Sequence, residues 1–223
     1  MTTTTSRRPT GARTANAAPD RSRRKLGVAL VASAAAVAAL FGIYASAAPS
    51  QGELPAPGKI SFITAEPASG SAPQMRLPSA DGSTFDLADL RGQSTLLYFQ
   101  EGLMCQACWT QLRDLENAQA ELKAAGVDQI VNVTTDPADL LAQKVEDEGF
   151  STTTVSDPTG EVSREFGALG VGMMGASMNG HSFVLVGPDG QIQWRADYGG
   201  APDYTMYVPV PQLLADLSTR TTA

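Results

Sequence analysis

The chain has two cysteines, Cys105 and Cys108, and two residues separate them. At this spacing the second sulfur can reach the first and resolve a mixed disulfide within the chain. The apolar segment 94–100 precedes the pair and an amphipathic segment follows it, which predicts a strand-to-helix junction. Backbone N–H groups at a helix N-terminus stabilise a thiolate and lower its pKa. The pair is therefore predicted to attack disulfides or peroxides.

Two other roles are open for this pair. A structural disulfide suits an extracytoplasmic domain, although so short a loop restricts the unfolded chain little. A structural zinc site needs four ligands, and the single histidine of the chain, His181, would have to be joined by a carboxylate. We therefore predict that Cys105 and Cys108 are catalytic, with no metal and no cofactor.

One acidic residue lies near enough to the cysteines to take part in proton transfer. Glu101 precedes Cys105 by four residues, so its carboxylate reaches the pair if the side chain turns inward. A solvated carboxylate is the alternative. Other acidic residues fall on predicted helix faces, where solvation is the simplest interpretation. Glu101 is therefore the predicted proton acceptor of the site.

Hydrophobic periodicity places the cysteines within a longer alternation of strands and helices. Short apolar segments between turn residues predict strands, and apolar residues at every third or fourth position predict helices. Asp136-Pro137 predicts an N-cap and a first-turn proline. The predicted strands are 94–100, 128–134, 152–155, 182–186 and 191–196, and the predicted helices are 109–126, 136–149, 161–166 and 211–217. Parallel β-α-β units followed by an antiparallel hairpin predict an α/β sandwich.

The first 25 residues differ in charge from the rest of the chain. They contain seven Lys or Arg and one Asp, whereas the whole chain has a formal net charge of -7. They also lack hydrophobic periodicity, so we expect residues 1–25 to be a disordered, basic cytoplasmic tail. The acidic remainder has no basic patch, which argues against nucleic acid as a partner.

Residues 26–48 carry no charge, and a helix of that length spans the roughly 30 Å hydrocarbon core of a membrane. The basic cluster before this segment predicts a cytoplasmic N-terminus with the remainder outside. We therefore expect a single-pass signal-anchor in the cell membrane. Cleavage at Ala45-Ser46-Ala47 is the alternative and would give a secreted protein. Residues 49–75 are rich in Pro, Gly, Ser and Ala, which predicts an extended linker.

The segment from Leu96 to Trp109 holds the cysteine pair, and the segment from Phe183 to Gly190 forms the predicted hairpin. With these two segments, residues 76–220 resemble the thioredoxin-like superfamily. Within it they are most similar to the redoxin branch, the alkyl hydroperoxide reductase/thiol-specific antioxidant or peroxiredoxin-like proteins. The resemblance implies a thioredoxin-like sandwich, with a central mixed sheet flanked by helices. It also implies that Cys105 matches the nucleophilic cysteine of thioredoxins.

Cys108 matches two residues of the superfamily, the resolving cysteine of thioredoxins and the peroxidatic cysteine of peroxiredoxins. Peroxiredoxins carry Pro-x-x-x-Thr-x-x-Cys, and here Glu101 and Cys105 hold the proline and threonine positions. Thioredoxins carry a tryptophan before the first cysteine and a proline ahead of the hairpin. This chain has Met104 and Gly180-His181-Ser182 there. Peroxide reduction of the usual kind and the usual substrate docking are therefore not implied.

In the thioredoxin-like fold, the loop before the hairpin borders the cysteine pair. By this resemblance Met173, Met174, Met178 and His181 belong to an active-site loop. Sulfur and imidazole ligands suit copper. A copper-binding thioredoxin-fold chaperone that uses the cysteine pair, His181 and the nearby methionines is therefore the alternative function.

We predict an oxidoreductase, namely a membrane-anchored, extracytoplasmic thiol-disulfide oxidoreductase with a redox-active disulfide. Cys105 attacks and Cys108 resolves. Antioxidant reduction of peroxides is the neighbouring activity. The expected partners are protein thiols, protein disulfides or peroxides, together with the membrane that holds the N-terminal helix.

Overall fold

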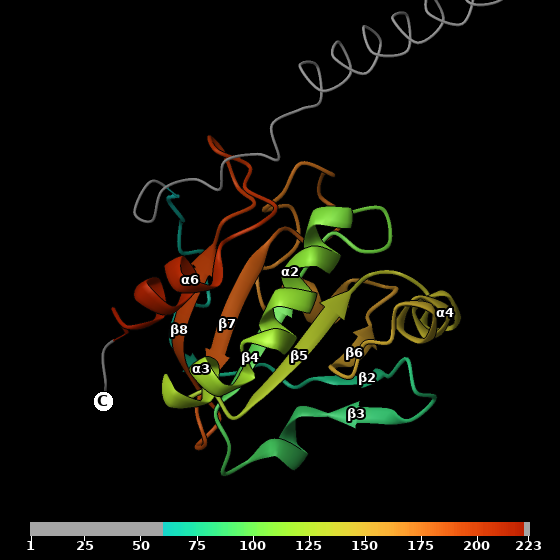
Figure 1. Cartoon of the computed structure of the whole chain (residues 1–223), viewed down its shortest axis with the longest axis horizontal. Helices are drawn as coiled ribbons and strands as arrows, with labels where there is room; N and C mark the ends of the chain where they lie inside the picture. Colours follow the sequence, from blue (N-terminus) through green and yellow to red (C-terminus); the bar gives the residue numbers. More distant parts are fainter. Residues whose placement is uncertain (1–59, 221–223) are drawn as a thin grey trace, which may run out of the picture. The chain divides into compact units, whose positions relative to one another are not determined.

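The computed structural model describes residues 60–220, and its centre is a six-stranded mixed sheet (Figure 1). The strands lie in the order β1-β8-β7-β4-β5-β6. They are β1 (Gly70–Ser71), β4 (Thr95–Phe99), β5 (Gln129–Thr134), β6 (Thr153–Ser156), β7 (Ser182–Val186) and β8 (Gln191–Asp197). β5 pairs in parallel with β4 and β6, whereas β7 pairs antiparallel with β4 and β8. The predicted parallel units followed by a hairpin are confirmed.

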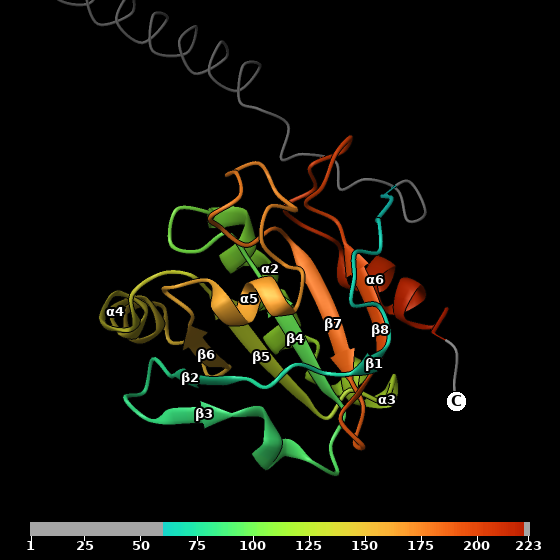
Figure 2. The same cartoon turned by 180° about the vertical axis from the view of Figure 1, so that it is seen from behind.

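Helices cover both faces of this sheet. Figure 1 shows α2 and α6 in front of the sheet, and Figure 2 shows α5 and the small β2-β3 sheet in front of the opposite face. Core contacts place α3 and α4 on the same face as α2, and η1 on the face of α5. The bounds are α2 (Gln106–Asn117), α3 (Gln119–Ala124), α4 (Ala138–Glu148), α5 (Glu161–Glu165), α6 (Val210–Leu217), β2 (Arg76–Pro78), β3 (Thr84–Asp86) and η1 (Leu87–Leu90).

Strand β4 contributes side chains to the cores on both faces. Leu96 and Tyr98 belong to the core beneath α2. Leu97 and Phe99 belong to the core on the α5 face, where the Phe99 ring contacts Phe166. This alternation follows from the two-residue period of a strand. All five residues of β4 are buried, so the strand shows a continuous apolar segment in the sequence.

The folded unit begins earlier than the sequence predicts. The composition of residues 49–75 predicts a linker, yet Ile63 forms a backbone bridge with β8 and Gly70–Ser71 pairs with β8 as β1. Met75 is buried in the core on the α5 face. Pairing at a sheet edge tolerates Pro and Gly, so composition alone does not reveal it. The boundary is corrected: residues 60–75 belong to the folded unit.

A buried ion pair ties this first segment to the sheet. Arg195 and Asp197 of β8 are both fully buried, with 2.8 Å between Nη2 and Oδ1. Asp197 Oδ2 also accepts the backbone N–H of Ala65 at 2.8 Å, and Arg195 donates to the carbonyl groups of Phe166 and Gly167. These hydrogen bonds offset the cost of burying two charges. The pair therefore joins the first segment, β8 and the chain after α5.

Two local predictions are wrong. The helix predicted over 109–126 is divided into α2 and α3 at Ala118, where φ is -101° and ψ is 22°. Asp136, the predicted cap of α4, does not cap it, because Pro137 is the N-cap and no side chain bonds there. The Asp136 carboxylate instead accepts the N–H of Leu103, far away in the sequence.

The tail predicted over 1–25 and the anchor predicted over 26–48 lie outside the described residues. Between residues 60 and 220, no helix is long and apolar enough to cross a membrane. The anchor and its orientation therefore stay predictions.

Candidate active site

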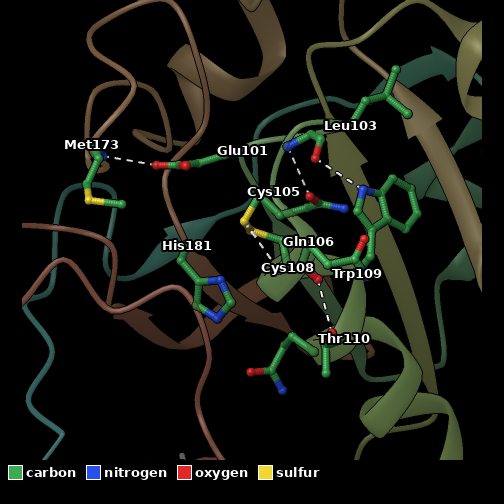
Figure 3. The surroundings of a disulfide bond; sticks show 12 residues. Glu101, Leu103, Cys105, Gln106, Cys108, Trp109, Thr110, Met173 and His181 are labelled. Atoms are coloured by element: carbon green, nitrogen blue, oxygen red, sulfur yellow. Dashed lines mark hydrogen bonds between the residues drawn. A yellow bond between two sulfur atoms is a disulfide. The ribbon is translucent and has the colours of Figure 1, made fainter. Parts of the chain in front are cut away.

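The two cysteines form a disulfide beyond the carboxyl end of β4 (Figure 3). β4 ends at Phe99, a short turn follows, and Cys105 is the N-cap of α2. The Cα atoms of Cys105 and Cys108 are 5.3 Å apart. The predicted strand-to-helix junction is confirmed. The pair lies where the N–H groups of the first helical turn have no partners within the helix.

Hydrogen bonds hold the turn between β4 and α2. The Gly102 N–H donates to Gln100 Oε1 at 2.9 Å, and the Leu103 N–H donates to Asp136 Oδ2 at 2.9 Å. The indole N–H of Trp109 donates to the Gly102 carbonyl at 3.1 Å. Gly102 has a φ of +94°, and an added Cβ would collide with the Asp136 carboxylate, so this position requires glycine. These contacts fix the cysteines relative to β4.

The two cysteines differ in access. Cys108 is 0% exposed, whereas Cys105 is half-buried. The Sγ of Cys105 accepts the backbone N–H of Cys108 at 3.2 Å. In the dithiol form the same N–H stabilises a negative charge on Cys105 Sγ, because donors at a helix N-terminus favour the thiolate. A substrate can therefore reach Cys105, and Cys108 lies behind it.

Behind Cys108 lies a buried pair of polar side chains. The Tyr98 hydroxyl donates to the Cys108 carbonyl at 3.2 Å and lies 3.1 Å from Nδ1 of His181. Tyr98 and His181 are both 0% exposed. Burial lowers the pKa of His181 from 6.5 to about 3. Burial, with a smaller effect of Glu101, raises the pKa of Tyr98 well above 10.0. Both side chains are therefore neutral near pH 7.

Glu101 fastens the glycine-rich loop beside the site. Its carboxylate is buried, and Oε1 accepts the backbone N–H of Met173 at 3.0 Å. Figure 3 shows this carboxylate directed toward Met173 and away from the disulfide. An added Cβ at Gly172 would lie 2.7 Å from the same Oε1, so the loop and the carboxylate are in close contact. The structure thus gives Glu101 a loop-holding contact, and its role as a proton acceptor stays a prediction.

Exposed methionines lie near the disulfide. Met104 directly precedes Cys105 and is 86% exposed, and Met173 is 58% exposed. Met174 is 50% exposed, whereas Met178 is half-buried. Figure 3 shows Met173 and His181 in the surroundings of the disulfide, so the structure brings the predicted loop and the cysteines together. Exposed apolar side chains next to a reactive group can take part in contacts with a partner.

Sequence analysis missed two residues of this site, Tyr98 and Asp136. Tyr98 lies in an apolar strand, where an aromatic residue is expected to pack in the core. The one sign of a further role in the sequence is its hydroxyl group, which needs a hydrogen-bond partner when it is buried. Asp136 precedes a proline and resembles a helix cap. In both cases the polar atom bonds to a distant part of the chain, which a local pattern does not show.

The described residues offer no metal site of the usual kind. Within residues 60–220, no group of three or more His, Cys, Asp and Glu side chains could hold a metal ion. Nδ1 of His181 faces the Tyr98 hydroxyl, and the ring is fully buried. The copper alternative is therefore not favoured.

Comparison with known proteins finds one matching family model and relatives that are named peroxiredoxins. The model of the AhpC/TSA family matches residues 69–195. Peroxiredoxin Bcp of Escherichia coli is 34% identical over 125 residues, which are 55% of this chain and 80% of that protein. A putative peroxiredoxin of Mycobacterium tuberculosis is 32% identical over 124 residues, which are 54% of this chain and 78% of that protein.

Solved structures share the fold. The crystal structure of peroxidoxin BcpB from Mycobacterium tuberculosis has a TM-score of 0.56 and 20% identity, and covers 69% of this chain and 98% of that one. The structure of AhpC from Enterococcus faecalis has a TM-score of 0.57 and 16% identity, and covers 68% of this chain and 90% of that one. The predicted thioredoxin-like α/β fold, with its mixed sheet and flanking helices, is thus confirmed. With its cysteine pair and the family match, this chain belongs to the AhpC/TSA family and is a thiol-dependent oxidoreductase.

Proposed function

We propose that this chain is a membrane-anchored, extracytoplasmic thiol-disulfide oxidoreductase that works through Cys105 and Cys108. The observation that carries the proposal is the asymmetry of the pair. Cys105 is partly exposed and its Sγ accepts an N–H at the start of α2, whereas Cys108 is buried. An attacking thiol needs access and a lowered pKa, and a resolving thiol needs only to reach the first sulfur. Cys105 therefore fits the attacking role, and Cys108 fits the resolving role.

The proposed reaction has two steps in the reducing direction. The Cys105 thiolate attacks one sulfur of a substrate disulfide, and the other substrate sulfur leaves as a thiolate and takes up a proton. Cys108 then attacks Cys105 Sγ and releases the second substrate thiol. The substrate gains two electrons and two protons, and the chain is left with the observed disulfide. A dithiol donor returns the pair to the reduced form, and the reverse sequence oxidises a dithiol.

The exposed methionines support a protein as the substrate. Met104 and Met173 present flexible thioether side chains near the reactive bond. Methionine adapts to partner surfaces of different shape. A peroxide needs no such surface, so these side chains favour a polypeptide disulfide.

Peroxide reduction is the second candidate, favoured by the family match and by relatives that are named peroxiredoxins. The Cys105 thiolate attacks one peroxide oxygen and becomes a sulfenic acid, and water or an alcohol leaves. Cys108 then condenses with the sulfenic acid, which releases water and forms the same disulfide. The resemblance puts the peroxidatic position at Cys108. Because Cys108 is fully buried, we assign the attack to Cys105 instead.

Trapping of a mixed disulfide tests the assignment of the two cysteines. The reduced full-length Cys108→Ser variant is mixed with a disulfide-bonded peptide, and mass spectrometry is expected to find a stable adduct on Cys105. The matched Cys105→Ser variant should give no adduct, because the Cys108 thiol is buried and the peptide cannot reach it. Equal adducts on both variants contradict the assignment. If neither variant forms an adduct and the wild-type chain leaves the peptide oxidised, disulfide exchange is excluded.

Competition between substrates separates the two candidate functions. The reduced wild-type chain is oxidised in parallel reactions by the disulfide-bonded peptide and by hydrogen peroxide, and the second-order rate of thiol loss is compared. Faster oxidation by the peptide supports disulfide exchange. Faster oxidation by peroxide, with a sulfenic acid trapped on Cys105 of Cys108→Ser, assigns the chain to peroxide reduction.

The proposed location has its own support in the sequence and its own test. An uncharged segment at 26–48 follows a basic cluster, which is the pattern of an anchor with a cytoplasmic N-terminus. A reporter fused after Ala223 should be active only outside the cytoplasm, and the chain should stay with membranes after a carbonate wash. Reporter activity in the cytoplasm contradicts the orientation. Release with a mass that matches cleavage near Ala47 replaces the anchor by a cleaved signal.

A further inference from the structure

The glycine-rich loop beside the disulfide is joined at its tip to the rest of the chain by one hydrogen bond. At the base of this loop, the backbones of Leu169 and Asn179 form a bridge. Residues 171–177 form the loop tip, and Figure 3 shows Met173 of the tip in the surroundings of the disulfide. Among the hydrogen bonds of residues 60–220, one joins the loop tip to a residue outside the loop, from the Met173 N–H to Glu101 Oε1 at 3.0 Å. The position of the tip therefore depends on Glu101.

Glu101 lies where it can fix the loop tip relative to the cysteines. It follows β4 in the turn that leads to Cys105, whose N–H donates to the carbonyl of Gly102 at 3.0 Å. The backbone of Glu101 thus belongs to the same turn as the attacking sulfur. Its carboxylate is buried, and none of the ion pairs within residues 60–220 involves it. Because a buried charge without a partner is costly, the hydrogen bond to Met173 stabilises both groups in this position.

The same hydrogen bond leaves the side chain of Met173 available to a partner. The bond uses the backbone N–H, whereas Met173 as a whole is 58% exposed. An extended polypeptide spans about 3.3–3.6 Å per residue. A few residues on one side of a substrate cysteine therefore reach from Cys105 to the neighbouring loop tip. A small disulfide reagent does not need this contact.

We infer that Glu101 is a positioning residue that sets substrate preference, because its hydrogen bond to Met173 holds the loop tip where a polypeptide disulfide docks. The assignment rests on the proposed function and deepens it by naming the residue that organises docking. Figure 3 shows the Glu101 carboxylate directed away from the disulfide, so it does not touch the reacting atoms. Loss of the hydrogen bond should therefore weaken the binding of a polypeptide and spare the exchange between sulfur atoms.

A glycine beside Met173 supports the same assignment. An added Cβ at Gly172 would lie 2.7 Å from Glu101 Oε1 and 2.8 Å from the Cα of Gly180. Only a residue without a side chain allows so close an approach of the loop backbone to the carboxylate. The variant Gly172→Ala should therefore push the loop tip away from Glu101, and it does so without removing the carboxylate.

Glutamine at position 101 separates loop positioning from proton transfer. The amide oxygen of the Glu101→Gln variant can accept the Met173 N–H, but the amide cannot act as a base. The Glu101→Ala variant can do neither. Glu146→Ala removes an exposed carboxylate of α4 and is the matched control.

Hydrogen exchange of the oxidised full-length chain tests the hydrogen bond itself. Mass spectrometry of peptides that cover residues 171–177 follows exchange of the amides in the loop tip. In Glu101→Ala we expect the Met173 amide to exchange about tenfold faster, which corresponds to the loss of one hydrogen bond to a charged group. Glu101→Gln and Glu146→Ala should exchange at close to the wild-type rate.

Kinetics with two substrates test the effect on docking. One substrate is a disulfide-bonded peptide with apolar residues beside its cysteines, and the other is dithiobis(nitrobenzoate), a small disulfide reagent. For Glu101→Ala we expect the KM for the peptide to rise about five- to tenfold while kcat stays within about twofold of the wild type. The rate with the small reagent should change less than about twofold. Glu101→Gln should restore most of the lost affinity.

The outcomes separate this inference from the function on which it rests. It is overturned by wild-type exchange in Glu101→Ala, by an unchanged KM for the peptide, or by equal slowing of both substrates in Glu101→Gln and Glu101→Ala. The last result would assign proton transfer to Glu101. If Glu101→Ala does not fold, Gly172→Ala replaces it, and wild-type exchange and KM in that variant overturn the inference. If the wild-type chain leaves the peptide oxidised, the proposed function fails and the docking role fails with it, whatever the exchange experiment shows.

Discussion

The two ends of strand β4 have different surroundings. At the carboxyl end, a turn through Gly102 leads to the disulfide, the buried Tyr98 and His181 pair and the exposed methionines. At the amino end, Thr95 lies in the wall of an open cavity of about 400 Å³, together with Arg76 and Arg91. The carboxyl end of β4 therefore holds the reactive sulfur atoms, and the amino end holds the cavity.

The cavity and the reactive cysteines thus lie at opposite ends of strand β4. Neither a cysteine nor a histidine lines the cavity at the amino end. Among the contacts of residues 60–220, each end has a buried polar atom without a hydrogen-bond partner, Oγ1 of Thr95 and Nε2 of His181. Only the carboxyl end also holds the disulfide, whose reduction creates two thiol groups. The chemistry of the neighbouring bond, rather than cavity size, distinguishes the active end.

Loss of the attacking sulfur should have the largest effect of any substitution. Cys105→Ser is expected to lower turnover of a peptide disulfide at least about a thousandfold, because the reaction then lacks its nucleophile. The matched change at the other end, Arg91→Ala, removes a side chain that lines the cavity and bonds to the Asp189 carbonyl. Its turnover should equal that of the wild type. A tenfold loss in Arg91→Ala would place part of the function in the cavity.

Two glycines with similar backbone angles sharpen the comparison. Gly92 precedes β4 with a φ of +91° and open space around an added Cβ, whereas Gly102 follows β4 with a φ of +94° and the Asp136 carboxylate in that space. Gly92→Ala should cost only the strain of this φ, on the order of 1–3 kcal/mol. Gly102→Ala should cost a further 1–3 kcal/mol or so, because displaced Asp136 leaves the Leu103 N–H unpaired. Urea unfolding of both variants measures this, and equal losses would contradict it.

Acid should weaken α2 at the end away from the cysteines. Burial raises the pKa of Glu116, but hydrogen bonds from Thr152 and Ser151 outweigh it, so the pKa is lowered from 4.5. This stabilisation is present above pH 4.5 and is lost as the pH falls through the lower folded-state value. Urea unfolding between about pH 6 and pH 3 should show a loss of about 1–2 kcal/mol from this group. Glu116→Gln should show a smaller acid dependence, and an equal one would refute the assignment.

Replacement of the loop methionines should have the smallest effect. Changing Met173, Met174 and Met178 together to Leu keeps side-chain volume roughly constant. The cysteine pair should therefore keep its rate with dithiobis(nitrobenzoate), while the KM for a peptide disulfide changes about two- to fivefold through altered contacts. An unchanged KM would remove these methionines from substrate docking. A changed rate with the small reagent would instead place them in the chemistry.

The sheet and the cysteine junction were predictable because their signals are local. The apolar segment of β4, the turn between β7 and β8 and the two-residue cysteine spacing each lie within a short stretch of chain. Burial on both faces makes such strands apolar throughout. Hydrophobic periodicity therefore identified the five longer strands in their order along the chain and a helix that begins near the cysteines.

The remaining features depend on partners far away in the sequence. Asp136 bonds to Leu103 instead of capping α4, and Glu101 bonds to Met173 instead of turning to the cysteines. β1 consists of two residues that have no strand pattern of their own and are defined as a strand by their pairing with β8. The hydrogen-bond partner of such a side chain cannot be predicted from the local sequence when two partners would satisfy it, because tertiary packing decides which of them lies within reach.

The edges of the six-stranded sheet have a consequence for behaviour in solution. One edge is β1, only Gly70–Ser71. At the other edge, the backbone N–H of Ala80 donates to the carbonyl of Thr154 in β6 at 2.8 Å, and Ser79 forms a bridge with Val155. Long unpaired edges are the usual route to strand-by-strand aggregation. Within the described part of the chain, both edges of the sheet are therefore partly occupied by this chain's own backbone, which leaves short stretches of edge strand for pairing with another chain.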